Sequence, residues 1–266
     1  MELQHSCMSD RQRRYRKEYR YRVAGWYHGW LHLMIIAMSG IAAIYIYTSN
    51  LVSVQWRDWL ALPLGFLSYQ LAEYLLHTQT MHRPRKSPML RALYIRHTLM
   101  HHQFFTEQEM RFADHRDWRV TFFPPFTMIV LTLLSLAPSL TAGLIISPNF
   151  GWLLMTALTG SYMFYEVVHF CCHVEDNWLI RNLPIINTAR RHHQAHHDQA
   201  LMMEVNMGIG TPIFDWLLGT SDLDRGFFGH LFNGYSSKYL KKNLRRTSRT
   251  PKPGNVKIPE SRTDAH

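Results

Sequence analysis

Residues 150–173 read FGWLLMTALTGSYMFYEVVHFCCH, an apolar stretch that ends in two histidines. About 20 residues at 1.5 Å per residue cross the ~30 Å hydrocarbon layer of a bilayer, so a helix here is long enough to span a membrane. His169 and His173 are four positions apart and therefore share one face of that helix. The stretch predicts a membrane helix that carries two imidazoles at one end.

Three other stretches have similar length and apolar character. The alternative is a set of buried helices in a large soluble domain, but such helices rarely run for 18 residues without a charged face. The mean hydropathy of −0.20 averages these blocks with strongly basic flanks, so it does not argue against a membrane. We predict an all-α integral membrane protein with four transmembrane helices: Trp30–Thr48, Trp59–Leu76, Val120–Thr141 and Phe150–Cys172.

The positions of the basic residues predict how the protein is oriented in the membrane. Of the 29 Lys and Arg residues, 28 lie in residues 1–24, in residues 77–119 or after His173, and the connections 49–58 and 142–149 contain only Arg57. Four crossings place the three basic segments on one face, which the positive-inside rule makes cytoplasmic. We therefore expect a multi-pass protein with cytoplasmic N- and C-termini. The formal charge of +10 then has a topological origin, and we expect no nucleic-acid partner, because the aromatic residues lie in the apolar blocks.

Ten histidines form four short clusters, all on the predicted cytoplasmic face. Neutral imidazole is a ligand for iron, zinc, copper or nickel. Ten such groups are too many for one structural zinc, which normally takes four ligands. We predict two adjacent metal ions with about five nitrogen ligands each, in a helical cap at the ends of the spans. The predicted ligands are His77, His82, His97, His101, His102, His169, His173, His193, His196 and His197.

The spacing within two clusters predicts how they bind. His97 and His101 lie at i and i+4, so we expect them to share an ion, with His102 turned about 100° towards the neighbouring ion. His77 and His82 are five residues apart, about 140° around an ideal helix, and cannot chelate one ion from a regular helix. We therefore expect the helix to end, unwind or carry a π-bulge between Leu76 and Arg83.

The last cluster leaves one choice open. His192 pairs with His196 at i+4 just as His193 pairs with His197. We prefer His193 as the ligand, because its grouping with the two later histidines mirrors the cluster at His97. Metal-bound imidazoles also need their second nitrogen held, usually by a carboxylate or a carbonyl. Our candidates for this supporting role are Glu73, Glu166, Asp198 and His192.

Short sequence motifs accompany the histidine spacing: EYLLH ending at His77, RRHH ending at His193, Asn206-x-Gly208, and Asp215-x3-Gly219-Thr220. Together these motifs resemble the fatty acid hydroxylase and sterol desaturase superfamily over about residues 60–222. The resemblance implies an integral-membrane di-iron enzyme that uses O₂ and two electrons to hydroxylate an unactivated C–H bond of a lipid. Some members of the superfamily desaturate instead. The implied cofactors are two iron ions, with zinc as a substitute in purified samples.

Two features depart from the superfamily pattern. Three residues separate His97 from His101, where fatty acid and sterol members usually have two. The chain also lacks the His-Pro-Gly-Gly signature of a fused cytochrome b5. We therefore expect a separate electron donor of the cytochrome b5, ferredoxin or reductase type, which the basic face could attract.

The expected organisation has three parts: a basic cytoplasmic segment 1–24, a four-span domain 25–237, and a basic tail 238–266. The tail is expected to be disordered or to lie on anionic headgroups, and the alternative is that it docks on the cytoplasmic helices. Two alternatives to the hydroxylase stay open. One is a desaturase on the same site, and the other is a non-enzymatic membrane metal transporter or sensor. Transporters usually place polar groups near the midplane of the membrane, whereas these clusters lie beyond the span ends.

Overall fold

The computed structural model describes residues 8–244, and within them every regular element is a helix. Residues 245–266 of the predicted tail lie outside the described part. The longer elements are α1 (Asp10–Arg22), α2 (Gly29–Thr48), α3 (Ala61–Leu76), α6 (Thr127–Ile145), α7 (Pro148–His173) and α9 (Pro184–His196). The shorter ones are η1 (Trp56–Leu60), η2 (His77–Met81), α4 (Pro88–Tyr94), η3 (Ile95–His101), α5 (His102–Phe104), η4 (His115–Val120), α8 (Trp178–Asn182), α10 (Ile213–Leu217) and α11 (Phe227–Leu231).

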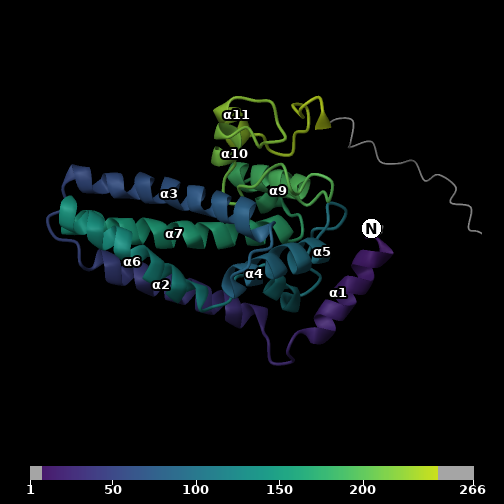
Figure 1. Ribbon diagram of the computed structural model, residues 1–266, viewed down its shortest axis with the longest axis horizontal. Helices are drawn as coiled ribbons and strands as arrows, with labels where there is room; N and C mark the ends of the chain where they lie inside the picture. Colours follow the sequence, from purple (N-terminus) through teal and green to yellow (C-terminus); the bar gives the residue numbers. More distant parts are fainter. Residues whose placement is uncertain (1–7, 245–266) are drawn as a thin grey trace, which may run out of the picture.

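Four long helices, α2, α3, α6 and α7, lie side by side as a bundle in which each runs opposite to the one before it in the chain (Figure 1). α7 is the central helix and packs against α2, α3 and α6. The approach of α3 to α7 depends on a small residue, because a Cβ atom at Gly65 would come within 2.5 Å of the Ala157 Cβ. Packing against three helices thus fixes the position of α7, whose last residue is His173.

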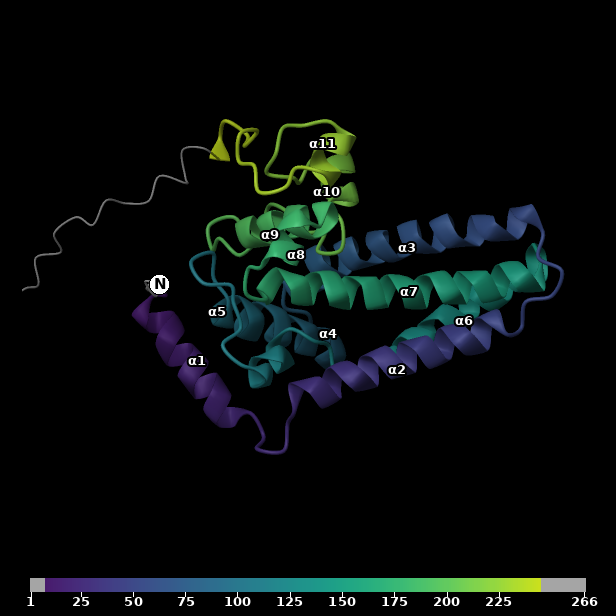
Figure 2. The same cartoon turned by 180° about the vertical axis from the view of Figure 1, so that it is seen from behind.

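The two short connections of the bundle lie at one end, and a cap of short helices and loops covers the other (Figures 1 and 2). The cap consists of residues 77–126 between α3 and α6, and of the chain after α7. α1 lies across this capped end. All four histidine clusters are therefore at the same end of the bundle, as the sequence predicted.

The helix boundaries support the membrane prediction in part. By length and composition alone, α2 and α6 are the two helices apolar enough to cross a membrane in the described residues. Only 22% and 17% of their apolar windows are buried, unlike the core helix of a soluble protein. The predicted start of the third span was wrong. Val120 ends η4, and α6 begins at Thr127, because Pro124 and Pro125 cannot donate to a helix and restrict the residues before them.

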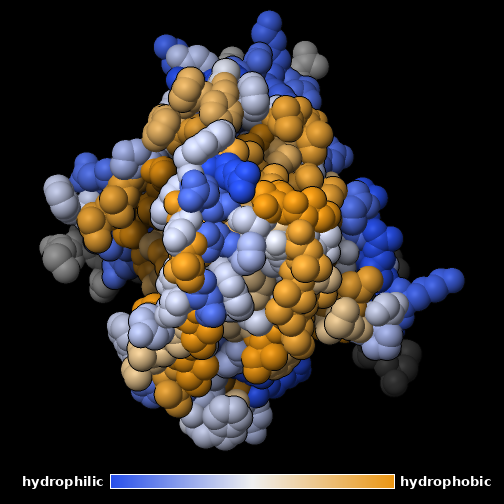
Figure 3. All heavy atoms as spheres, turned by 90° about the vertical axis from the view of Figure 1, so that its left-hand side faces the viewer, coloured by the Kyte–Doolittle hydropathy of each residue, from blue (hydrophilic) through white to orange (hydrophobic). Residues whose placement is uncertain are grey.

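The flanks of the bundle are apolar and exposed. Figure 3 looks onto the end with the short connections, where hydrophobic side chains cover the flanks and hydrophilic ones gather towards the middle. Monomeric soluble proteins rarely expose an apolar surface of this extent. Exposed large apolar residues of the bundle include Leu31, Met34, Ile35, Met38, Ile41, Leu64, Leu67, Leu71, Leu133, Leu134, Leu140 and Leu144.

Candidate metal centre

The ten predicted histidines gather at the capped end of the bundle, and all ten side chains are buried. Nine of them form two groups whose nitrogen atoms lie within 4.8 Å of one another. The tenth, His169, joins the second group, since its Nε2 lies 3.2 Å from Nε2 of His101. The first group is His77, His82, His97, His102 and His196; the second is His101, His169, His173, His193 and His197.

Two π-helical turns place histidines that are five residues apart on one face. In η2 the amide of His82 donates to the carbonyl of His77 over 3.2 Å, an i→i+5 bond. Of the three alternatives predicted between Leu76 and Arg83, the structure thus has the π-helical one. In η3 the amide of His102 donates to the carbonyl of His97 in the same pattern. Each turn holds one residue more than an α-helical turn, so both pairs point into the first group.

The π turn in η3 corrects the predicted partition of this cluster. His97 shares its group with His102, and His101 points into the other group. The last cluster is divided in the same way: its outer histidines, His193 and His197, share the second group, and His196 between them joins the first. The additional residue before His101 is absorbed by the π turn. In both clusters that contain two adjacent histidines, the two neighbours therefore belong to different groups.

Backbone carbonyls hold the second ring nitrogen in five of the imidazoles. A carbonyl oxygen only accepts, so each of these Nδ1 atoms carries the hydrogen, and in the neutral ring the Nε2 atom keeps its lone pair. The pairs are His77 with Met207, His101 with Val120 (3.3 Å), His173 with Met110 (2.8 Å), His196 with Val205 (3.0 Å) and His197 with Phe105 (2.9 Å).

This arrangement fits bound cations. The Nε2 atoms of His101 and His197 lie 3.1 Å apart with both lone pairs directed inwards, a contact that is repulsive without a positive charge between them. Nitrogens about 2.1 Å from a shared ion lie about 3.0 Å apart at right angles and about 3.4 Å apart in a tetrahedron. The contacts within the groups are 2.7–3.2 Å. The donor sets therefore fit two ions with more than four ligands each.

Burial keeps the imidazoles in their ligand form. Loss of solvent lowers the pKa of His77 to about 4, although the hydrogen bond from Nδ1 to the Met207 carbonyl and the nearby Asp215 act in the opposite direction. Desolvation and the neighbouring His77 lower the pKa of His82 to about 2. The same causes hold the pKa of His97 and His196 well below the usual value. At neutral pH these rings are uncharged and available to a metal.

The predicted carboxylate supports act on the backbone instead of the imidazoles. In five of the ten imidazoles a carbonyl oxygen already lies beside Nδ1, and the carboxylates accept instead from amides that would otherwise be buried without a partner. Glu73 accepts from the amides of Ile209 (2.7 Å) and Gly210 (3.4 Å), Glu166 from the Phe123 amide (3.2 Å) and the Tyr162 hydroxyl (2.7 Å), and Asp198 from the Ala200 amide (2.9 Å).

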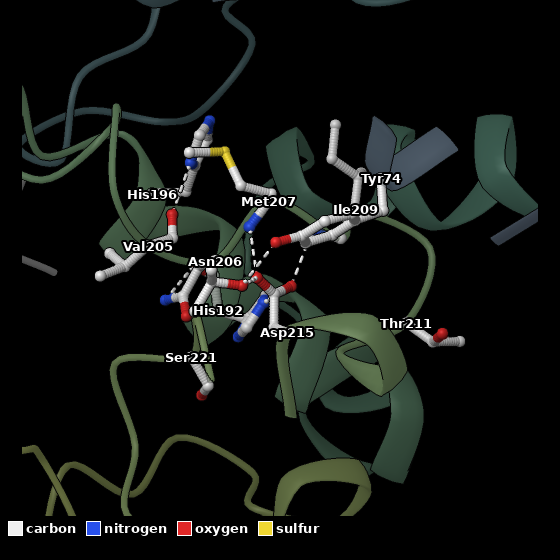
Figure 4. A network of polar contacts seen from close by, with 12 residues as sticks. Tyr74, His192, His196, Val205, Asn206, Met207, Ile209, Thr211, Asp215 and Ser221 are labelled. Atoms are coloured by element: carbon white, nitrogen blue, oxygen red, sulfur yellow. Dashed lines mark hydrogen bonds and ion pairs between the residues drawn. The ribbon is translucent and has the colours of Figure 1, made fainter. Parts of the chain in front are cut away.

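His192 is turned away from both groups, and its Nε2 donates to Oδ2 of Asp215 over 3.0 Å (Figure 4). The same fully buried carboxylate accepts from the amides of Met207 (2.8 Å) and Gly208 (2.6 Å). It thereby fixes the peptide whose carbonyl faces His77. Sequence reasoning assigned no role to Asp215. Its presence in the quoted motif Asp215-x3-Gly219-Thr220 was the only indication in the sequence. A motif alone does not reveal a contact between a side chain and the backbone.

A cavity of about 20 Å³ adjoins both histidine groups. Its walls include His97 of the first group and His101 and His169 of the second, together with Phe123 and Tyr165. A space of this size holds about one water-sized molecule. The Oγ1 atom of Thr121, which also lines it, is buried without a hydrogen-bond partner.

The geometry agrees with a comparison against known families. A model described as fatty acid hydroxylase matches residues 62–220, more than half of the chain. The chain belongs to the fatty acid hydroxylase family. No curated protein and no solved structure matches it. The matched region contains all ten clustered histidines and Asp215, but it begins after α1 and α2. Family membership suggests a histidine-box oxidoreductase whose buried clusters could hold metal ions.

Proposed function

We propose that the protein is a membrane-bound di-iron oxidoreductase that hydroxylates a C–H bond of a lipid. The observation that carries this proposal is the pair of buried five-histidine groups within a fatty acid hydroxylase domain. The overall reaction consumes one O₂, two electrons and two protons per C–H bond, and it yields an alcohol and one water. The iron ions would supply the redox chemistry that activates O₂.

The contribution of the chain is to hold ligands, exclude water and admit the lipid. His77, His82, His97, His102 and His196 would hold one ion, and His101, His169, His173, His193 and His197 the other. The small cavity between the groups is the place where a reacting carbon would approach. Its apolar walls, Met81, Leu93 and Phe123, would have to move apart to admit an acyl chain.

We infer that all four long helices cross the membrane. α3 alone is about 24 Å long, shorter than the ~30 Å hydrocarbon layer. The 3₁₀ turn η1 precedes it directly and adds about 10 Å, so the combined run is long enough. The capped end would then lie in the cytoplasm, because residues 1–24, residues 77–119 and the chain after His173 hold 28 of the 29 basic residues.

Electrons would come from a separate carrier. A hollow on the cap is lined by the basic residues Arg85, Lys86 and Arg91 next to Tyr94. Such a surface would attract an acidic redox protein of the cytochrome b5 or ferredoxin type, or a reductase, by electrostatic steering. η3, which carries His97 and His101, directly follows α4. The basic residues of this surface are therefore close in sequence to ligands of the metal centre.

The proposal is tested by lipid mass spectrometry on cells with and without the gene, grown under isotopically labelled O₂. A lipid that gains one labelled oxygen only when the gene is present supports hydroxylation. Loss of two hydrogens without added oxygen identifies a desaturase on the same site. The matched control is His101→Ala, which should accumulate in the membrane without forming the product. Product formation by this variant would contradict the proposal.

The competing class is a metal transporter or sensor. Metal-dependent uptake into proteoliposomes, without any oxidised lipid, would support that class. Both histidine groups lie at one end of the bundle, whereas transport sites usually lie near the midplane. Metal identity should be measured in iron-replete, anaerobic preparations, because zinc binds the same nitrogen donors.

A further inference from the structure

α1 lies outside the region that matches the family, yet it is built into the cap. The family match begins at residue 62, and the sequence predicts residues 1–24 as a separate basic segment. In the structure α1 crosses the capped end of the bundle (Figure 2). Two of its polar side chains, Gln12 and Arg16, are only 2% and 3% exposed. Burying a guanidinium is costly unless its N–H groups are bonded, so the position of Arg16 calls for a reason.

Arg16 binds three backbone carbonyls of one cap segment. Its Nε donates to the Phe104 carbonyl over 2.7 Å, and its two terminal nitrogens donate to those of Glu109 (2.9 Å) and Arg111 (3.0 Å). Gln12 donates through Nε2 to the Phe104 and Glu109 carbonyls over 2.9 Å each. The carbonyls bound by Arg16 thus flank Met110 on both sides and precede Phe105.

The same segment supports the second histidine group. The Phe105 carbonyl accepts from Nδ1 of His197, and the Met110 carbonyl accepts from Nδ1 of His173. Arg16 therefore fixes peptides next to the two carbonyls that orient these ligands, on both sides of Met110 and before Phe105. A ring held through its second nitrogen keeps its tautomer and its direction towards the metal.

Further along the segment, α1 makes a second contact. Arg20 binds both carboxylate oxygens of the fully buried Asp117 over 2.7 Å each. Asp117 also accepts from the Ala113 amide over 2.9 Å. Three residues later, the Val120 carbonyl faces Nδ1 of His101, a third ligand of the second group.

The first group has a separate support. Its carbonyls come from Val205 and Met207, in the loop that Asp215 and Glu73 bind. We propose that α1, through Arg16, is a positioning element of the second histidine group. This inference rests on the proposed metal function, and it predicts that the two ions are lost separately.

The test measures metal stoichiometry in the full-length protein, purified in detergent and loaded with Co(II). Wild type should hold about two ions per chain. Arg16→Met keeps an apolar stem but no donors, and it should hold about one. Adding His173→Ala to that variant should change nothing further, whereas adding His77→Ala should bring the content close to zero. The matched control on the same helix is Arg13→Met, whose parent side chain is 58% exposed, and it should keep two ions.

A mirror variant tests the selectivity. Asp215→Asn weakens the support of the first group, so this variant should hold about one ion. Adding His173→Ala should remove that ion, whereas adding His77→Ala should leave it in place. If Arg16→Met does not accumulate, Gln12→Leu gives the milder form of the test. A chelator should then remove one of the two ions about 10-fold faster than from wild type, in line with the usual effect of a ligand's supporting contact.

Two outcomes overturn the inference while leaving the proposed function intact. In one, Arg16→Met and Gln12→Leu keep both ions with wild-type release rates. In the other, both ions are lost in parallel, as expected when the cap merely unfolds. A wild-type protein that binds neither Co(II) nor Fe(II) would instead overturn the proposed function, and this inference with it.

Discussion

The Nε2 atoms of His101 and His197 face each other over 3.1 Å, while the Nδ1 atom of each ring faces a backbone carbonyl. Two neutral rings in this state cannot share a hydrogen bond through Nε2, because neither Nε2 atom carries a hydrogen. The chain thus places lone pairs where a cation would remove the repulsion. The direction of each ring is set by main-chain atoms, so the segments that carry those carbonyls are as much part of the centre as the ligands.

Removal of one ligand from either group should abolish product formation. His101→Ala and His196→Ala are expected to lower the metal content of the protein below two ions per chain while leaving membrane insertion unchanged. Metal analysis, lipid mass spectrometry and membrane fractionation check the three parts. His28→Ala, a substitution at an exposed histidine, is the control and should retain both ions. Full activity in either ligand variant would remove that residue from the site.

The neighbouring histidines 192 and 193 should respond differently to substitution. His193→Ala removes a nitrogen from the second group, so one ion should be lost outright. His192→Ala leaves both groups complete but deprives Asp215 of one partner, and we expect a loss of about 1–3 kcal/mol in unfolding free energy. Thermal unfolding and metal titration separate the two effects. Equal metal content in both variants would contradict the assignment.

Acid should destabilise the metal-free protein. Burial lowers the folded-state pKa of His77 to about 4, whereas an unfolded histidine titrates near 6.5. Above pH 6.5 the ring is neutral in both states, so pH has little effect through this group. Between about pH 6.5 and pH 4 the unfolded state binds the proton more strongly, and stability falls as the pH is lowered. Unfolding of the chelator-treated protein at several pH values measures this, and a stability that rises on acidification would refute it.

Gly208 should not tolerate a side chain. A Cβ atom there would overlap the Thr211 carbonyl oxygen and come within 2.9 Å of Oδ2 of Asp215. Gly208→Ala should therefore displace the loop that orients His77 and cost about 1–3 kcal/mol. Gly160→Ala is the control, because a Cβ atom there would meet nothing within 4 Å. Comparable thermal stability of the two variants would argue against a tight loop.

The two ends of the bundle should lie on opposite sides of the membrane. With the native cysteines replaced, Val52→Cys at the short-connection end should react with an impermeant thiol reagent added to intact cells. Met89→Cys in the cap should react only after permeabilisation. Both parent side chains are more than 70% exposed, so access is not limited by burial. Labelling of both from the same side would exclude the four-span topology.

The sequence predicted the helical class, the gathering of ten histidines at one end and a departure from regular α-helical winding between Leu76 and Arg83, with a π-bulge among the alternatives. These follow from local properties, namely apolar length, charge and the spacing of imidazoles along a helix. The partition of His97, His101 and His102 was predicted wrongly, because an i, i+4 rule assumes a regular α-helix and η3 is a π turn. Carboxylate support was also predicted wrongly, because proximity along the chain does not say which main-chain atoms fold beside a ring.

Other parts of the centre depend on contacts between distant segments. Asp215 acts on Met207 across a loop, and Arg16 acts on carbonyls more than 80 residues away along the chain. Neither contact leaves a periodic signal in the sequence. Arg16 in particular lies in a strongly basic stretch, where a solvated face is the usual expectation.

The π turns η2 and η3 imply that two histidines face the same group when they are one helical turn apart, whether that turn holds four residues or five. Shortening either turn by one position would restore ordinary α-helical winding, and the same two imidazoles would again stand one above the other. Proteins with different numbers of residues between these histidines can therefore build equivalent centres. A search that requires one rigid interval would pass over such chains, whereas one that permits a single-residue slip at each turn would recognise them.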